Sequence, residues 1–302
     1  MKYFPIAACT ILLISISACS SARLSSPTLT ATAAVAAMPL STDTLVATPT
    51  GTNTPIGTAV PNGPCDNPLV PLGKSNQWTY RVTSAGGETL FSLASTGSQP
   101  GAQVAQVVFS DQKNNFTVTK PVTCKDGAIV DYPLLVLNML FSDYLSTFFS
   151  ATQKTGDYAP NYQSLTRNDW ILNWQAGYLT ENDAAFQLSS GNAGLDMPPN
   201  TLIELSSSMI GVREAVSVPA GDFPQALKIT QDVSMPVIFT GGGSGAGDSL
   251  KIMITQWYEP YVGLVRAEIT SVTMRVTQSF PHFFYDLPIE SKLELMEFKP
   301  GK

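Results

Sequence analysis

Histidine is almost absent from this sequence, which carries only His282 among 302 residues. The four cysteines are Cys9, Cys19, Cys65 and Cys124, and no two of them form a C-x-x-C pair. Zinc sites are built from clustered cysteine and histidine ligands, so this shortage excludes a His/Cys zinc site, and the missing C-x-x-C disfavours a redox pair. No EF-hand loop occurs, although carboxylate calcium sites stay open. We therefore predict a protein without a cofactor.

Motifs of common catalytic and nucleotide sites are missing as well. The run GGGSGAG at 241–247 lacks the final glycine of a G-x-S-x-G elbow and the Gly-Lys-Ser/Thr ending of a phosphate loop, so we interpret it as a hairpin loop. His282 lies in the aromatic stretch FPHFFYD, where packing is a more typical role than catalysis. A pair of glycosidase carboxylates stays open, because only the fold sets their separation. The prediction is a protein that is not an enzyme.

Charge is sparse and mildly acidic. The chain has 17 basic and 23 acidic residues. Loss of an N-terminal leader would remove Lys2 and no acidic residue, which leaves 16 basic against 23 acidic residues and a net charge of −7. This balance excludes nucleic acid as a partner and disfavours an electrostatic grip on anionic lipid.

The N-terminus has the layout of a secretory signal over residues 1–18. An apolar stretch from Ile6 to Ile16 follows Lys2, and it is shorter than the about 20 apolar residues that a membrane-spanning helix needs. The sequence ISAC then resembles a bacterial lipobox, in which the cysteine thiol takes up a diacylglyceryl group after cleavage. We predict that Cys19 carries acyl chains such as palmitate and anchors the chain to membrane lipid in the bacterial cell envelope, outside the cytoplasm. The alternative is an ordinary signal peptide with a chance cysteine.

Residues 19–63 form the predicted lipidated tether. From Ser20 to Gly63 there is no aromatic residue, and Arg23 and Asp43 are the only charges among Ser, Thr, Ala, Pro and Gly. Such a segment cannot bury enough apolar area to offset the entropy of ordering it, so we predict disorder. A short helix over TATAAVAAMPL is the weaker alternative.

Residues 64–302 are predicted to form a single β-rich extracytoplasmic domain. In NQWTYRVTS, Trp78, Tyr80 and Val82 alternate with polar residues, which is typical of a half-buried strand. Two long strands should meet at Glu259-Pro260, and the apolar parity of the second strand flips near Thr270, which predicts a β-bulge or a sharp bend there. The fold class is mostly β, a large curved antiparallel sheet or open barrel.

One segment has the spacing of a helix instead. In YPLLVLNMLFSDYLSTFF, apolar residues recur at three and four positions over about 134–149. This pattern predicts an amphipathic helix packed on the concave face of the sheet. A helix lying on a membrane is less favoured, because its polar face has no lysine or arginine.

The cysteine count predicts one disulfide in the mature domain. Cys9 leaves with the signal and Cys19 takes lipid, so Cys65 and Cys124 remain as a pair in an oxidising compartment. A loop of roughly 60 residues would contribute about 4 kcal/mol of stability in the chain-entropy model.

Several stretches together resemble a known family. NPLVPLGKSNQWTY, VSVPAGDFPQALKIT and QWYEPYVGLVRAEIT, placed after a lipobox and tether, are similar to bacterial envelope lipoproteins often labelled TapB-like. The resemblance implies an all-β domain and no established activity, so no catalytic residue is carried over. The chain departs from the family at Glu259 and at Tyr261, where relatives commonly have glycine.

The leading functional prediction is a membrane-anchored envelope lipoprotein that acts as a non-enzymatic binding or scaffold module. The first alternative is a carrier or sensor of an apolar ligand in a β groove, and the second is a hydrolase. The pairs Trp257-Tyr258 and Trp78/Tyr80 are open to two interpretations, a sugar-stacking platform or part of a β core.

Overall fold

The computed structural model describes residues 65–73, 75–97, 103–165, 172–187, 194–239, 248–277 and 283–301. The predicted signal, the tether with Cys19, the glycine-rich run and His282 lie outside these residues.

The first part of the domain is a run of antiparallel strands, each paired with the next. In β1, Trp78, Tyr80 and Val82 are buried, as the alternation predicts. These strands are β1 (Gln77–Ser84), β2 (Gly87–Gly97), β3 (Val104–Asp111), β4 (Phe116–Lys125) and β5 (Ala128–Asp131).

The middle of the chain holds the two helices of the described residues and several short strands. Neither helix has the length and apolar character needed to cross a bilayer, and this holds for the described part of the chain. The elements are α1 (Leu135–Leu140), β6 (Ala151–Gly156), α2 (Tyr162–Leu165), β7 (Leu172–Thr180), β8 (Ala184–Gln187) and β9 (Gly194–Met197).

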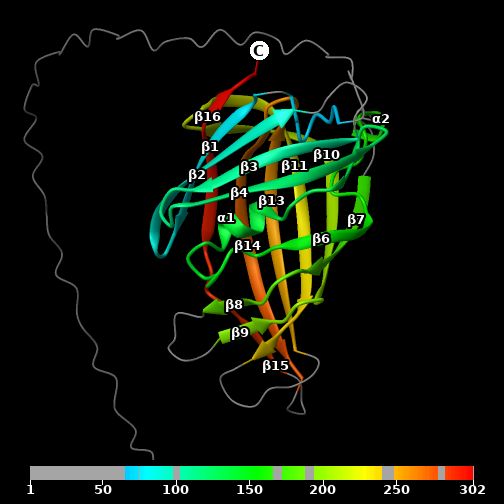
Figure 1. Cartoon of the computed structure of the whole chain (residues 1–302). Coiled ribbons are helices and arrows are strands. Elements are labelled where there is room, and N and C mark those ends of the chain that lie inside the picture. Colours follow the sequence, from blue (N-terminus) through cyan, green and yellow to red (C-terminus); the bar gives the residue numbers. More distant parts are fainter. Residues whose placement is uncertain are drawn as a thin grey trace, which may run out of the picture. The chain divides into compact units, whose positions relative to one another are not determined.

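The last part contains the longest strands, which stand upright in Figure 1 while β1–β4 slant across them. Pro219 and Ala220 form the turn between β10 and β11, where Val218 pairs with Gly221. The elements are β10 (Leu202–Val218), β11 (Gly221–Pro236), β12 (Ile238–Phe239), β13 (Ser249–Glu259), β14 (Gly263–Val276), β15 (Phe283–Asp286) and β16 (Ser291–Lys299).

The main sheet curves until it nearly closes into a barrel, which confirms the predicted fold class. Its strand order is β5-β4-β3-β2-β1-β16-β14-β13-β11-β10-β7-β6, with β15 paired to β14. The first strand of the domain thus pairs with the last, along the full length of β1. A small second sheet has the order β12-β9-β8.

The predicted bulge lies at Thr270. Met253 pairs with Ser271 and Ile254 pairs with Ile269, so Thr270 has no partner on β13 and is the extra residue. Its Oγ1 donates to the carbonyl oxygen of Met253 at 3.0 Å. A bulge keeps apolar side chains on the inner face after the sequence parity changes.

The helix is shorter than predicted. It ends at Leu140 rather than near 149, and the chain then makes turns up to Leu145, which forms an isolated β-bridge with Phe186. The cause is the side chain of Asn138, whose Nδ2 donates to the Phe149 oxygen at 2.8 Å and whose Oδ1 accepts from the Phe149 nitrogen at 2.7 Å. Eleven residues of continuous helix would place these residues about 16 Å apart, so the chain must reverse between them.

The helix nevertheless covers the inner face of the sheet. It contacts β1, β14 and β16, and all six of its residues are buried. Because no side of α1 faces water, it is a core helix and has no exposed polar face.

The two edges of the sheet meet at a seam between β5 and the residues that follow β6. The Ile129 nitrogen donates to the Ala159 oxygen at 2.9 Å, and the Tyr158 nitrogen donates to the Ile129 oxygen at 2.7 Å. The side chain of Asn67, which is fully buried, spans the same seam. Its Nδ2 donates to the oxygens of Gly127 at 2.9 Å and Pro160 at 2.8 Å, one on each side.

Asn67 also shapes the segment in which it lies. Its Oδ1 accepts hydrogen bonds from the backbone nitrogens of Leu69 at 2.9 Å and Val70 at 3.3 Å. All the main hydrogen-bonding positions of this amide are therefore used, and it connects the start of the domain to both edges of the sheet.

We predict that Asn67→Ala lowers the free energy of unfolding by at least about 3 kcal/mol, because it leaves several buried backbone groups without a partner at about 1–3 kcal/mol each. Urea denaturation with the disulfide intact measures the loss. Asn173→Ala, at an exposed position of β7, is the control and should change stability by less than about 0.5 kcal/mol. Equal effects of the two substitutions would contradict the role of Asn67.

Candidate functional site

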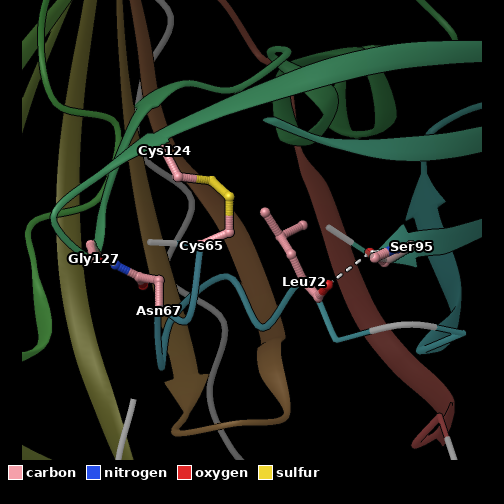
Figure 2. The surroundings of a disulfide bond; sticks show 7 residues. Cys65, Asn67, Leu72, Ser95, Cys124 and Gly127 are labelled. Carbon is pink, nitrogen blue, oxygen red and sulfur yellow. Dashed lines mark hydrogen bonds between the residues drawn. A yellow bond between two sulfur atoms is a disulfide. The ribbon is translucent and has the colours of Figure 1, made fainter. Parts of the chain in front are cut away.

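The start of the domain is joined to β4 by a disulfide. Cys65 and Cys124 are bonded, with their Cα atoms 5.0 Å apart, as the cysteine count predicts. Both residues are buried, at 4% and 0% exposure. Figure 2 shows the bond beside Asn67, whose amide points to Gly127. Covalent and hydrogen bonds therefore hold the same short segment against the end of the barrel.

Two of the segments that carry the family resemblance meet at this end. The Trp78 Nε1 donates to the Val262 oxygen at 2.6 Å, and the Tyr80 hydroxyl donates to the Leu264 oxygen at 3.1 Å. The turn between β13 and β14 is further held by a bond from the Tyr261 nitrogen to the Pro68 oxygen at 2.9 Å. The first strand and the β13–β14 hairpin thus form one hydrogen-bonded unit.

Tyr261 lies in the turn between β13 and β14. It has φ of 64°, in the left-handed region that glycine adopts most easily. A tyrosine therefore adopts this backbone conformation at some cost in strain.

The third segment reaches β16 at its tip. At the tip of the β10–β11 hairpin, the Ala220 nitrogen donates to the Leu295 oxygen of β16 at 3.1 Å. Further down the hairpin, Glu214 accepts from Trp257 Nε1 at 2.9 Å and pairs with Lys228 at 2.9 Å. These bonds from Trp257 and Lys228 keep the pKa of Glu214 below its usual range.

The aromatic pairs do not form an open sugar platform. Trp78, Tyr80, Trp257 and Tyr258 are all at most 8% exposed. Arg266 Cζ lies 5.0 Å and Lys228 Nζ 5.7 Å from the centroid of the Trp257 ring. These two cations already cover the ring, where a sugar would otherwise stack. The interpretation as part of a β core is the one that the structure supports.

Inside the barrel, tyrosines that are buried or half-buried gather near the seam. The rings of Tyr132 and Tyr158 stack at 4.6 Å, the Tyr258 hydroxyl donates to Gln256 Oε1 at 2.5 Å, and Tyr158 and Tyr258 are hydrogen-bonded to each other. Burial raises the pKa of Tyr158 to about 12 and holds that of Tyr258 well above its usual range. These hydroxyls therefore stay protonated at physiological pH and act as neutral hydrogen-bonding groups.

The interior cavity beside these tyrosines is small. Its volume is about 40 Å³, and its walls come from the Leu69–Leu72 segment, β1, α1 and the β13–β14 hairpin. An engineered cavity of about 150 Å³ binds benzene, so 40 Å³ is room for a few water molecules and not for an acyl chain. The inner face of the sheet is thus filled by the protein's own side chains.

Two larger grooves open at the surface. The β14–β16 groove, of about 950 Å³, lies where β14 leaves β16 after the Thr270 bulge. The phenylalanine groove, of about 470 Å³, lies between the ends of β2–β4 and the residues after α1; Phe91, Phe109, Phe116 and Phe148 line it. Phe148 contacts both Phe109 and Phe116, with ring centroids 5.6 and 5.2 Å apart.

Carboxylates do not gather into a metal-binding group. Among the described residues, no three His, Cys, Asp or Glu side chains lie close enough to hold an ion. Two carboxylates have pKa values shifted in opposite directions. Burial raises the pKa of Asp131, and hydrogen bonds from Ser150 and Thr152 lower the pKa of Glu181. Neither residue lines the interior cavity or the two grooves.

Comparison with known proteins finds solved structures whose backbones resemble this one. The chain matches no protein-family model and no curated protein sequence. A solved structure from Bacteroides fragilis, provisionally described as an exported protein with a YmcC-like fold, is 16% identical with a TM-score of 0.44 and covers 75% of this chain and 96% of its own. A second, provisionally described as a lipoprotein from Parabacteroides distasonis, is 17% identical with a TM-score of 0.44 over 76% of this chain and 97% of its own.

Sequence reasoning placed the disulfide correctly and missed Asn67 and the two grooves. Cys19 and His282 lie outside the described residues. The signal that could have indicated Asn67 is its place in Asn67-Pro68, a dipeptide typical of turns. The grooves have no comparable signal, because each is lined by residues from distant parts of the chain.

Ionisation of Glu259, at the β13–β14 turn, should oppose folding. Partial burial raises its pKa, and its Oε2 has no hydrogen-bond partner among the described residues. A raised folded-state pKa means that the native state loses stability as pH rises from the unfolded-state value of about 4.3 through the folded value. Glu259→Gln should therefore stabilise the protein more at pH 7 than at pH 3.5.

Urea denaturation at the two pH values measures this difference. The exposed Glu204→Gln on β10 is the matched control and should show little change between the two pH values. A Glu259→Gln effect that is the same at both pH values would show that ionisation of this side chain does not oppose folding.

Proposed function

We propose that this protein is a lipid-anchored lipoprotein of the bacterial cell envelope whose β domain binds or holds a partner without catalysing a reaction. The observation that carries the proposal is the filled interior. Among the described residues, the cavity beside α1 has a volume of about 40 Å³, which is too small for an acyl chain. The outer surface, with its two grooves, is then the part of the domain that can meet a partner.

The membrane anchor in this proposal rests on the sequence. Cys19 follows Ile16-Ser17-Ala18, and the residues after it have the composition of a tether. Stable anchoring needs more than one acyl chain, which a lipidated N-terminal cysteine supplies. The disulfide at Cys65 joins the point where this tether enters the domain to the interior of the sheet.

The second candidate is a carrier of an apolar ligand, and one observation favours it. The phenylalanine groove offers four aromatic rings, and Phe116 at its rim is 37% exposed. Ligand pockets are lined mainly by such side chains. A carrier would hold its ligand in this groove, outside the filled interior.

The anchor is tested with Cys19→Ala, which should abolish incorporation of labelled palmitate and leave an uncleaved precursor. Cys9→Ala is the matched control, since Cys9 lies within the leader, and it should be labelled and processed normally. Normal labelling of the Cys19 variant would remove the lipoprotein from the proposal.

The filled interior is tested with Phe141→Ala. Phe141 follows α1, is 1% exposed and lies 5.6 Å from the Phe186 ring, so its truncation should cost about 3–5 kcal/mol. Phe284→Ala, at 68% exposure, is the control and should leave the melting temperature unchanged. Phe148→Ala should cost less than Phe141→Ala, because Phe148 is half-buried.

Native mass spectrometry of the wild-type protein separates the two candidates. If the protein is a binding or scaffold module, its measured mass should equal that of the acylated chain, with no further lipid bound. Unchanged melting of the Phe141 variant together with a bound lipid that Phe148→Ala releases would favour the carrier.

A further inference from the structure

The β14–β16 groove results from the bulge at Thr270. Below the bulge, β14 pairs with β16 from Arg266 to Glu268, opposite Glu294 to Lys292. Beyond it β14 turns away, and it next pairs with β15 from Thr273 onward. The groove is the space left where the two strands diverge. Residues of β14 form one wall, and residues 286–290 form the opposite wall.

Strand edges border the groove without a strand between them. Ile269 and Ser271 of β14 pair with β13 on one side, and, among the described residues, 269–271 pair with no strand on the side of β16. Ser291 of β16 pairs with Ser84 of β1 on one side only. Unpaired strand edges are the feature to which an extended peptide adds by backbone hydrogen bonds.

The charge that lines the groove is mostly negative. Its carboxylates are Glu268, Asp286, Glu290 and Glu294, and its only cation is Lys292. Glu268 and Glu294 pair with arginines beside the groove, Arg266 and Arg81, whereas Asp286 and Glu290 have no ion pair among the described residues and are exposed. Two carboxylates are therefore left to attract a cation.

A buried hydroxyl adds an independent observation. Ser291 lies in the wall of the groove and is 5% exposed, and its Oγ has no hydrogen-bond partner among the described residues. A buried hydroxyl without a partner costs free energy, which a hydrogen bond to an entering group would recover.

We propose that the β14–β16 groove binds an extended segment of a partner protein that carries lysine or arginine side chains. Its backbone pairs with the open strand edges, and its cations lie against Asp286 and Glu290. The proposal deepens the proposed function, since it gives the binding module a site and a class of partner. Strand edges favour a peptide over a small amine, because only a peptide supplies backbone donors and acceptors along a strand.

The test uses the intact acylated protein in uncharged detergent and a fluorescein-labelled peptide of alternating lysine and valine. Fluorescence anisotropy should show binding that weakens as salt rises from 50 to 500 mM, because the attraction is electrostatic. A peptide of alternating glutamate and valine should bind at least 10-fold more weakly. Equal binding of both peptides, or of neither, would overturn the proposal.

Charge reversal locates the binding. Asp286→Lys with Glu290→Lys should weaken binding of the lysine peptide at least 10-fold, and both side chains are exposed, so the fold should tolerate the change. Asp196→Lys with Glu204→Lys makes the same change in charge at exposed positions outside the groove and should leave at least half of the affinity. Equal losses in the two double variants would show that only the overall charge matters.

Two further measurements separate a strand-pairing site from simpler ones. A lysine peptide methylated on alternate backbone nitrogens keeps its charge but loses its donors, so it should bind at least 10-fold more weakly. Ser291→Ala should weaken binding several-fold without lowering the melting temperature. Unaltered binding of the methylated peptide, or complete competition by equimolar spermidine, would replace the proposal with a site for small amines.

The outcomes distinguish this proposal from the proposed function. Loss of peptide binding with normal labelling of Cys19 and a lipid-free mass would reject the groove as the site and leave the lipoprotein module standing. A bound lipid in the wild-type protein would reject the module regardless of the peptide result.

Discussion

The side chain of Asn67 is the contact on which the closure of the barrel depends. A sheet that curves until its edges meet must join its two edge strands to each other. Among the described residues, backbone bonds between Ile129 and residues 158–159 do so. Asn67 adds one bond to each edge, through Gly127 and Pro160, from a buried position. Because the same segment carries Cys65, the disulfide holds this amide in place by a covalent connection to β4.

Closure of the seam explains why the interior is filled. Once the edges meet, the inner face of the sheet has a limited volume, and α1 together with the tyrosines near the seam occupies it. A longer helix could not fit the path of the chain, because Asn138 must meet Phe149 after a reversal. The two grooves at the surface are therefore larger than the interior cavity. The β14–β16 groove is the larger of the two, because the bulge at Thr270 separates β14 from β16.

Much of the fold could be predicted from local pattern. The alternation of apolar and polar residues predicted β1, and the change of apolar parity predicted the irregularity at Thr270, because each depends on neighbours in sequence. The helix was predicted too long, since the apolar spacing of three and four residues continues through turns that pack against β8 and the phenylalanine groove. The spacing of apolar residues indicates which residues are buried. It does not indicate whether a single helix buries them.

The sequence by itself determined the β class, the disulfide pair and the position of the bulge, and it carries the lipobox prediction at Cys19. These depend on composition, on cysteine count and on alternation over a few residues. Only the tertiary structure decided that Asn67 joins Gly127 to Pro160, that Trp257 is covered by Arg266, and that carboxylates from β14, β16 and the residues between β15 and β16 share one groove. The physical reason is that these contacts join residues far apart in the chain, and their geometry exists only after the sheet has closed.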